Sequence, residues 1–210
     1  VTFGWGLGRG MSVSGGRYLE FVLPGILALS AMNNSFTPVS TSLNISKLYT
    51  KTLEEVLVSP VSPWDIALGR TLTGLARGSF SALMLMLVGI ISGVHLHLSV
   101  SFFAILFLTA FCFGAAGVAA AMITRTHEDM ANFNSFFILP MSFLAGTFFS
   151  PDKLPEPFRS LILVYPLTHA SILLRALASG SEPAPGSVVV LAAYAAVFFF
   201  VAGRLVKRRI

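Results

Sequence analysis

The acidic and histidine side chains of this chain are too few and too scattered to suggest a catalytic site. The sequence has nine acidic residues and four histidines, whereas acid–base or nucleophilic catalysis needs paired carboxylates or a base beside a nucleophile. His95 and His97 stand two residues apart, but His127 and His169 are remote in sequence and a metal site needs further ligands. We therefore predict no catalytic residue, no metal site and no cofactor bound by this chain.

A nucleotide site is not predicted either. The glycine-rich stretch "GWGLGRG" at 4–10 lacks the GxGxxG spacing, and no Gly-Lys dipeptide is present to form a Walker A motif. Any energy from ATP must therefore come from another polypeptide. The net charge of +5 comes from basic residues near the ends of apolar runs rather than on one face, a pattern typical of membrane anchoring and not of nucleic-acid binding.

A stripe of polar residues runs along the first long apolar segment. Its members recur every three to four residues and so share one face of a helix. They are Asn33, Thr37, Ser40, Thr41 and Asn44. Polar side chains at membrane depth turn from lipid toward water or other helices. The stripe therefore predicts either a face that lines a pathway for a polar cargo group or a set of interhelical hydrogen bonds.

The elements that would position this stripe are membrane-spanning helices. The chain is 55% hydrophobic and 11% charged, against about 45–50% and about 25% in soluble domains. Five apolar runs approach the roughly 20 residues that cross a bilayer core. These are about 19–44, 72–94, 99–123, 133–149 and 187–205. Because the runs are continuous rather than alternating, we predict an all-α polytopic transmembrane helical bundle in a single domain, 1–210.

The basic tail predicts the orientation of the bundle. "GRLVKRRI" directly follows the last apolar run, so the positive-inside rule puts the C-terminus in the cytoplasm. Five spans then place 46–71 and 124–132 on the same side. The long outer segment is broken by prolines into pieces too short to cross, and we predict re-entrant or interfacial helices in its 150–180 region.

The segment "LEEVLVSPVSPWDIALGR" between the first two runs carries clear helix signals. Thr52 and Glu55 match a capping box, and Pro60 ends the element, which predicts a short amphipathic helix over 52–59. Ser62 is a candidate N-cap for the next helix. The short helix either lies flat on lipid or contacts a protein partner. An anionic leaflet attracts Lys and Arg rather than Glu, so a partner is favoured.

Small residues predict where helices approach closely. The second run holds two GxxxG pairs, Gly74 with Gly78 and Gly89 with Gly93, and Gly114 begins the stretch "GAAGVAAA" in the third run. Such spacing permits close helix packing in membranes. We interpret these glycines as packing positions rather than cargo contacts.

The runs "YLEFVLPGILALSAMNNSF", "LEEVLVSPVSPWDIALGR" and "FFILPMSFLAGTFFSPDKLPEPFRSLILVYPLTH" together resemble the permease subunit of ABC-2-type exporters. That group includes drug exporters and exporters of lipid-linked or lipo-oligosaccharides, nodulation-type permeases among them. The resemblance covers nearly the whole chain and implies six spans in the full protein, of which this chain lacks the first. It also implies that 52–59 is a cytoplasmic coupling helix that inserts into an ATP-binding subunit.

The resemblance assigns contact and elbow roles to the residues of that segment. The contact candidates are Glu54, Glu55, Leu57, Val58, Ser59 and Pro60, and the elbow candidates are Asp65, Gly69 and Arg70. It further implies a homodimer in the cytoplasmic (inner) membrane, with ATP and magnesium on the partner ATPase, that exports an amphiphilic substrate. The alternatives are a passive channel or assembly scaffold, and an intramembrane lipid-modifying enzyme. The enzyme is disfavoured because among acidic residues only Glu20 touches a predicted span.

Overall fold

The computed structural model describes residues 18–52, 55, 60–144 and 156–208, and every regular element in those ranges is a helix. The all-α prediction is therefore confirmed for the described chain. The elements are α2 (Tyr18–Leu48), α4 (Pro63–Ile91), α5 (Val100–Ile123), α6 (His127–Phe133), the π-helix η1 (Asn134–Ile138), α7 (Leu139–Leu144), α8 (Glu156–Leu163), α9 (Pro166–Ala178) and α10 (Pro185–Lys207).

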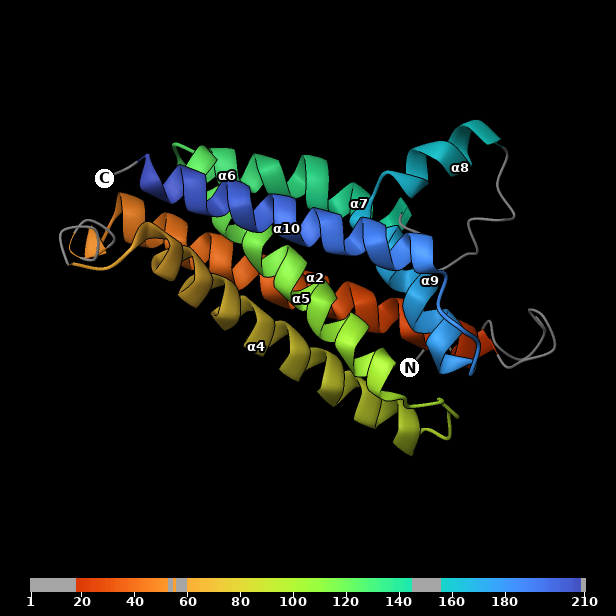
Figure 1. Ribbon diagram of the computed structural model, residues 1–210. Coiled ribbons are helices and arrows are strands. Elements are labelled where there is room, and N and C mark those ends of the chain that lie inside the picture. Colours follow the sequence, from red (N-terminus) through yellow and green to blue (C-terminus); the bar gives the residue numbers. More distant parts are fainter. Residues whose placement is uncertain (1–17, 53–54, 56–59, 145–155, 209–210) are drawn as a thin grey trace.

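The long helices run side by side and reverse direction from one to the next (Figure 1). The helices α2, α4, α5 and α10 form the body of the bundle, and α6, η1 and α7 continue one another along its side. The end of α2, the start of α4 and the C-terminus lie at one end of the molecule. The α4–α5 turn and α9 lie at the other. We call these the α10-terminal end and the α9 end.

Three described helices are long and apolar enough to cross a membrane by length and composition alone: α4, α5 and α10. The helix α2 has 31 residues, about 46 Å at 1.5 Å per residue, but the polar stripe lowers its hydropathy. The apolar run predicted at 133–149 is not one uniform helix, because η1 interrupts it between α6 and α7. Five spans remain an interpretation of this arrangement.

Local sequence signals account for the start of α4. Ser62 has extended backbone angles and its hydroxyl accepts a hydrogen bond from the Trp64 N–H at 3.3 Å. Pro63 occupies the first helical position and Asp65 lies in the first turn, where both residue types are favoured. The helix therefore begins at Pro63, well before the apolar run at 72 that we predicted as its span.

The helix α9 lies inside the bundle at the α9 end. It contacts α2, α5 and α10, and Leu167, Leu173 and Leu174 are fully buried. The Arg175 Nε–H donates to the Phe21 carbonyl at 3.0 Å, and its guanidinium lies 4.2 Å from the centre of the Phe21 ring. At 13 residues, about 20 Å, α9 is too short to cross a bilayer core.

Candidate functional site

The α2 stripe divides into two parts with different environments. Asn33 is half-buried and Thr37 is exposed on the flank of the bundle, whereas Ser40 and Asn44 are completely buried. Thr41, between the two parts, is half-buried. The stripe is therefore not one continuous pathway-lining face: its first part borders a groove, and its last part lies in the helix packing.

The groove lies between α2 and the η1–α7 segment and has a volume of about 410 Å³. Polar side chains line it from both sides. They are Asn33 and Thr37 of α2, Asn134 and Ser135 of η1, and Ser142 of α7. Leu29, Ile138 and Phe143 are among its apolar lining residues. We call this feature the polar groove, and its mixed lining suits a molecule with polar and apolar parts.

Asn134 has an unusual environment in the polar groove. Its side-chain oxygen is buried and has no hydrogen-bond partner among the described residues. A buried amide oxygen without a partner costs free energy, so such groups are rare in folded proteins. The residue also opens the π-helix, a departure from α-geometry that is frequent at functional sites. Asn134 is thus placed to accept a hydrogen bond from a water or a passing polar group.

The buried part of the stripe belongs to a hydrogen-bond network at the α10-terminal end. The Asn44 amide donates to Thr124 Oγ1 at 3.3 Å, and Asn44 Oδ1 lies 3.4 Å from His127 Nδ1. The Lys47 ammonium donates to the Ala121 carbonyl at 2.7 Å and also to the Thr124 carbonyl. Lys47 thereby satisfies carbonyls that the end of α5 leaves free, where a positive charge is favoured. This Lys47 network joins the last turns of α2 to the α5–α6 connection.

The connection itself is stabilised by a capping box. The Thr126 hydroxyl accepts from the Asp129 N–H, and the Asp129 carboxylate accepts from the Arg125 and Thr126 N–H groups at 2.9 and 3.0 Å. These backbone hydrogen bonds lower the pKa of the Asp129 carboxyl below its ordinary value. Because α6 is fixed at its first turn and followed by η1, the network and the polar groove share one continuous helical segment.

Much of the predicted coupling helix falls outside the described residues. Glu54, Leu57, Val58 and Ser59 are among those not described. Thr52 and Glu55 are helical and exposed, the Glu55 N–H donates to the Lys51 carbonyl at 3.4 Å, and Pro60 is exposed at a bend. These described residues are accessible at the α10-terminal end.

The predicted elbow residues lie on the first two turns of α4. Asp65 and Gly69 are exposed, and Arg70 is half-buried beside Pro38 and Ser42 of α2 at a small cavity of about 70 Å³. Arg70 therefore lies where the start of α4 meets the half of α2 that follows Pro38.

The small residues sit where α2, α4 and α5 approach most closely. A methyl group on Gly74 would lie 2.9 Å from the Gly114 Cα, and one on Gly114 would lie 2.9 Å from the Thr71 carbonyl. A methyl group on Gly78 would lie 2.6 Å from the Ala31 carbonyl, and one on Gly89 would collide with Leu23. These glycines leave the room in which the helix backbones meet.

Gly93 is a correction to the packing prediction. The helix α4 ends at Ile91, and Gly93 is exposed with φ +83° and no atom within 4 Å of the place where a methyl group would lie. Its role is to adopt the left-handed conformation after the helix end, where glycine is favoured. The second GxxxG pair fails because the helix stops before its second glycine.

The arrangement described so far is a bundle of long helices, three of which are long and apolar enough to cross a membrane. Among the residues that the structure describes, no group of three His, Cys, Asp or Glu side chains is placed to hold a metal ion. A sequence model of the ABC-2 type transporter family matches residues 2–178. The chain belongs to the ABC-2 type transporter family. The family resemblance inferred from the three sequence runs is thereby confirmed, and the protein is a membrane-embedded transport permease.

Named relatives of the ABC-2 family cover most of this chain. The inner membrane transport permease YadH of Escherichia coli strain K12 is 26% identical over 197 residues, which span 92% of this chain and 77% of YadH. Nodulation protein J of Rhizobium meliloti is 27% identical and covers 99% of this chain and 82% of its own length. Nodulation protein J of Sinorhizobium fredii is 28% identical, with 100% and 83% covered.

Sequence reasoning missed three residues of the polar groove in this ABC-2 permease. Asn134, Ser135 and Ser142 lie within the fourth predicted run, and they were not singled out because they are isolated polar residues in a mostly apolar stretch. Asn134 and Ser135 belong to the π-helix η1, and Ser142 belongs to α7. A search for every polar residue within a predicted span, whatever its spacing, would have found them.

Proposed function

We propose that this chain is the permease subunit of an ATP-binding cassette exporter that moves an amphiphilic or lipid-linked substrate across the cytoplasmic (inner) membrane. The observation that carries the proposal is the polar groove, in which amide and hydroxyl groups face one another at the flank of an apolar bundle. Apolar residues of the same groove would accept the hydrophobic part of the cargo. Drugs, lipid-linked glycans and lipo-oligosaccharides all have this character.

Energy is supplied by a separate ATP-binding subunit, which holds ATP and magnesium. This subunit contacts the permease at the α10-terminal end, on the 52–59 segment around Glu55 and on the start of α4. The basic residues Arg204, Lys207 and Arg208 near the C-terminus support a cytoplasmic location for this end. Five spans with α8 and α9 on the outer side fit that orientation.

The Lys47 network provides a route by which a push at this end would reach the groove. It ties the last turns of α2 to α5 and α6, and both walls of the groove continue from these elements. Closure of the ATP-binding subunits would therefore tilt α2 and α6 together. The bundle acts as the two-state element whose equilibrium nucleotide binding shifts.

A second permease copy completes the proposed transporter. Large apolar side chains of η1 and α7 that the chain leaves exposed include Phe136, Phe137 and Phe143. Phe143 lines the polar groove, and a second copy or lipid would cover the three rings. In the homodimer, the two grooves would line one route.

Reconstitution with the candidate ATP-binding subunit tests the proposal. The two proteins are co-purified in lipid nanodiscs, and ATP hydrolysis is compared between the wild type and the Glu55→Ala/Leu57→Ala variant. We expect the variant to lose the complex or the coupling of hydrolysis to the permease. The matched control is Glu182→Ala, which removes an exposed carboxylate near the α9 end. This control should behave as the wild type.

Two results would contradict the proposal. If no ATP-binding subunit associates with the full-length wild type, a passive channel or assembly scaffold becomes the better description. If the subunit associates and the Glu55→Ala/Leu57→Ala variant keeps normal hydrolysis and transport, the 52–59 segment is a loop helix on lipid rather than a coupling helix.

A further inference from the structure

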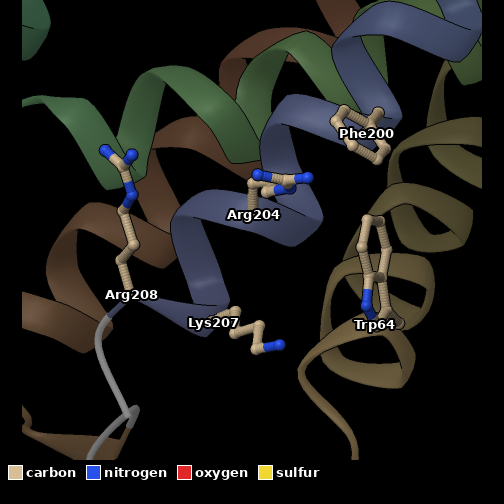
Figure 2. Close-up of a pocket in the computed structure, with 5 residues that line it drawn as sticks. All are labelled: Trp64, Phe200, Arg204, Lys207 and Arg208. Carbon is tan, nitrogen blue, oxygen red and sulfur yellow. The ribbon is translucent and has the colours of Figure 1, made fainter.

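A basic and aromatic pocket lies at the α10-terminal end, between the last turns of α10 and the first turn of α4. Its volume is about 570 Å³, and it is lined by Trp64, Phe200, Arg204, Lys207 and Arg208. Figure 2 shows Lys207 extending toward Trp64 across the gap between the two helices, whereas Arg208 extends away from it. The pocket thus combines three positive charges with two aromatic rings.

The aromatic wall of the pocket is held in place by packing. The Trp64 ring contacts the Phe199 and Phe200 rings at centroid distances of 6.0 and 5.7 Å. Gly203 leaves the room for the indole, because a methyl group there would lie 2.8 Å from one of its ring atoms. The Arg204 guanidinium lies over the Phe200 ring at 4.8 Å. Such a cation–π contact orients the guanidinium without neutralising its charge.

The charges of this pocket lack an anionic partner in the described chain. Within the described residues no ion pair joins Arg204, Lys207 or Arg208 to a carboxylate. Asp65 follows Trp64 directly but is exposed and makes no such pair there. Three exposed cations beside an aromatic wall favour an anion, and phosphate oxygens accept hydrogen bonds from both guanidinium and ammonium groups.

A separate apolar groove lies along α10, on the turns that precede the basic side chains. It has a volume of about 320 Å³ between α5, α10 and the α6–η1–α7 segment, and Val197 and Val201 are part of its lining. Positions 197, 201, 204 and 208 are spaced four, three and four residues apart and share one helical face. At 1.5 Å per residue, Arg204 follows Val201 by about 5 Å and Arg208 by about 10 Å along the axis. A hydrocarbon chain that runs along this face of α10 from a phosphate at Arg204 and Arg208 would reach the groove at Val201.

We propose that this pocket binds the phosphate-bearing headgroup of an anionic phospholipid of the leaflet at the α10-terminal end, with one acyl chain in the apolar groove. The apolar groove favours a lipid over free phosphate, and Trp64 has the aromatic character typical of the membrane interface. The bound lipid would clamp the start of α4 to the end of α10. This inference needs only that the chain is embedded in a membrane, and it does not depend on the exported substrate or on the ATP-binding subunit.

Quenching of Trp64 fluorescence tests lipid binding directly. The full-length protein carries the substitution Trp5→Phe. Trp64 is then the only tryptophan of this sequence that contributes fluorescence. It is reconstituted in phosphatidylcholine nanodiscs that contain one tenth brominated phosphatidylglycerol. Parallel nanodiscs contain the same fraction of brominated phosphatidylcholine, and a third set contains only plain phosphatidylcholine and receives inorganic phosphate in solution.

We expect brominated phosphatidylglycerol to quench Trp64 selectively. Each basic residue near an anionic lipid contributes roughly fivefold in binding, so Arg204→Gln/Lys207→Gln should weaken the selectivity about 25-fold. The matched control is Lys51→Gln/Arg125→Gln, which removes two exposed charges at the same end without touching the pocket. Control selectivity should stay within about threefold of the wild type, and thermal melts verify that both double variants fold.

Three results would overturn the proposal. Equal quenching by the two brominated lipids would show that the pocket does not distinguish an anionic headgroup from a zwitterionic one. Full relief of quenching by millimolar inorganic phosphate would identify a site for a free anion. If Arg204→Gln/Lys207→Gln keeps lipid selectivity but releases the ATP-binding subunit, the pocket is a protein contact.

Discussion

Replacement of Gly78 by alanine probes the close approach of α4 and α2. The added methyl group would collide with the Ser35 hydroxyl and lie 2.6 Å from the Ala31 carbonyl. The hydroxyl could rotate away, but the carbonyl is part of the α2 backbone, so α2 and α4 must separate. Overpacking of a tight interface costs about 1–3 kcal/mol. The higher helix propensity of alanine offsets about 1 kcal/mol of this cost, which leaves a net loss of up to about 2 kcal/mol.

The matched control for this change is Gly69→Ala in the same helix. Gly69 is exposed, with no atom within 4 Å of the added methyl group, so only the propensity gain applies. For a protein of about 200 residues, 1 kcal/mol shifts the melting temperature by roughly 2–4 °C. We expect Gly78→Ala to melt up to about 8 °C below the wild type and Gly69→Ala at or above it, by circular dichroism in detergent. Equal melting temperatures of the two variants would refute the close packing of α2 on α4.

Three further predictions concern the network, the cap and the polar groove. Lys47→Met removes the ammonium donor from the Ala121 and Thr124 carbonyls and should cost about 1–3 kcal/mol in thermal unfolding, whereas Lys47→Arg should retain most of the stability. The Asp129 carboxyl has a lowered pKa, so its capping contribution is fully present above the unfolded pKa of about 3.9 and is lost as pH falls through the folded value. The amide protection factors at the start of α6, which are corrected for the intrinsic exchange rate, should therefore fall below about pH 4, and Asp129→Ala should remove that pH dependence. Asn134→Leu should leave melting unchanged or raised but reduce uptake of an amphiphilic dye into inverted vesicles; unchanged uptake would separate the groove from transport.

The start of α4 was predictable because its signals are local. Ser62 and Pro63 act within one turn of the chain, and their residue types alone favour a helix beginning there. The apolar run predicted from residue 72 marks only the part of α4 that is apolar, and not the residue at which the helix begins. Hydropathy detects the part of a helix that fits a bilayer, and it is blind to the polar turns that extend α4 toward the coupling segment.

The polar groove could be predicted only in part because it depends on tertiary structure. Asn33 and Thr37 belong to a regular stripe, but sequence spacing could not tell that Ser40 and Asn44 turn into the packing instead. That division depends on where α5 ends, since Thr124 is the partner of Asn44. The π-helix that contains Asn134 has no compositional signature. The packing role predicted for Gly93 was wrong for a simpler reason. The second GxxxG pair extends beyond Ile91, where α4 ends.

The helix α2 connects the features on which transport would depend. Its Asn33 and Thr37 border the polar groove, and its Lys47 anchors the end of α5 two turns or more further along. Directly after α2 comes the segment that the proposal places against the ATP-binding subunit. Pro38 lies between the groove and the anchor, and a proline inside a helix removes a backbone hydrogen bond and permits bending. The half of α2 that follows Pro38 is anchored to α5 through Lys47, whereas the half that precedes it packs on α9. A displacement at the α10-terminal end would therefore bend α2 near Pro38. Such a bend would change the width of the polar groove.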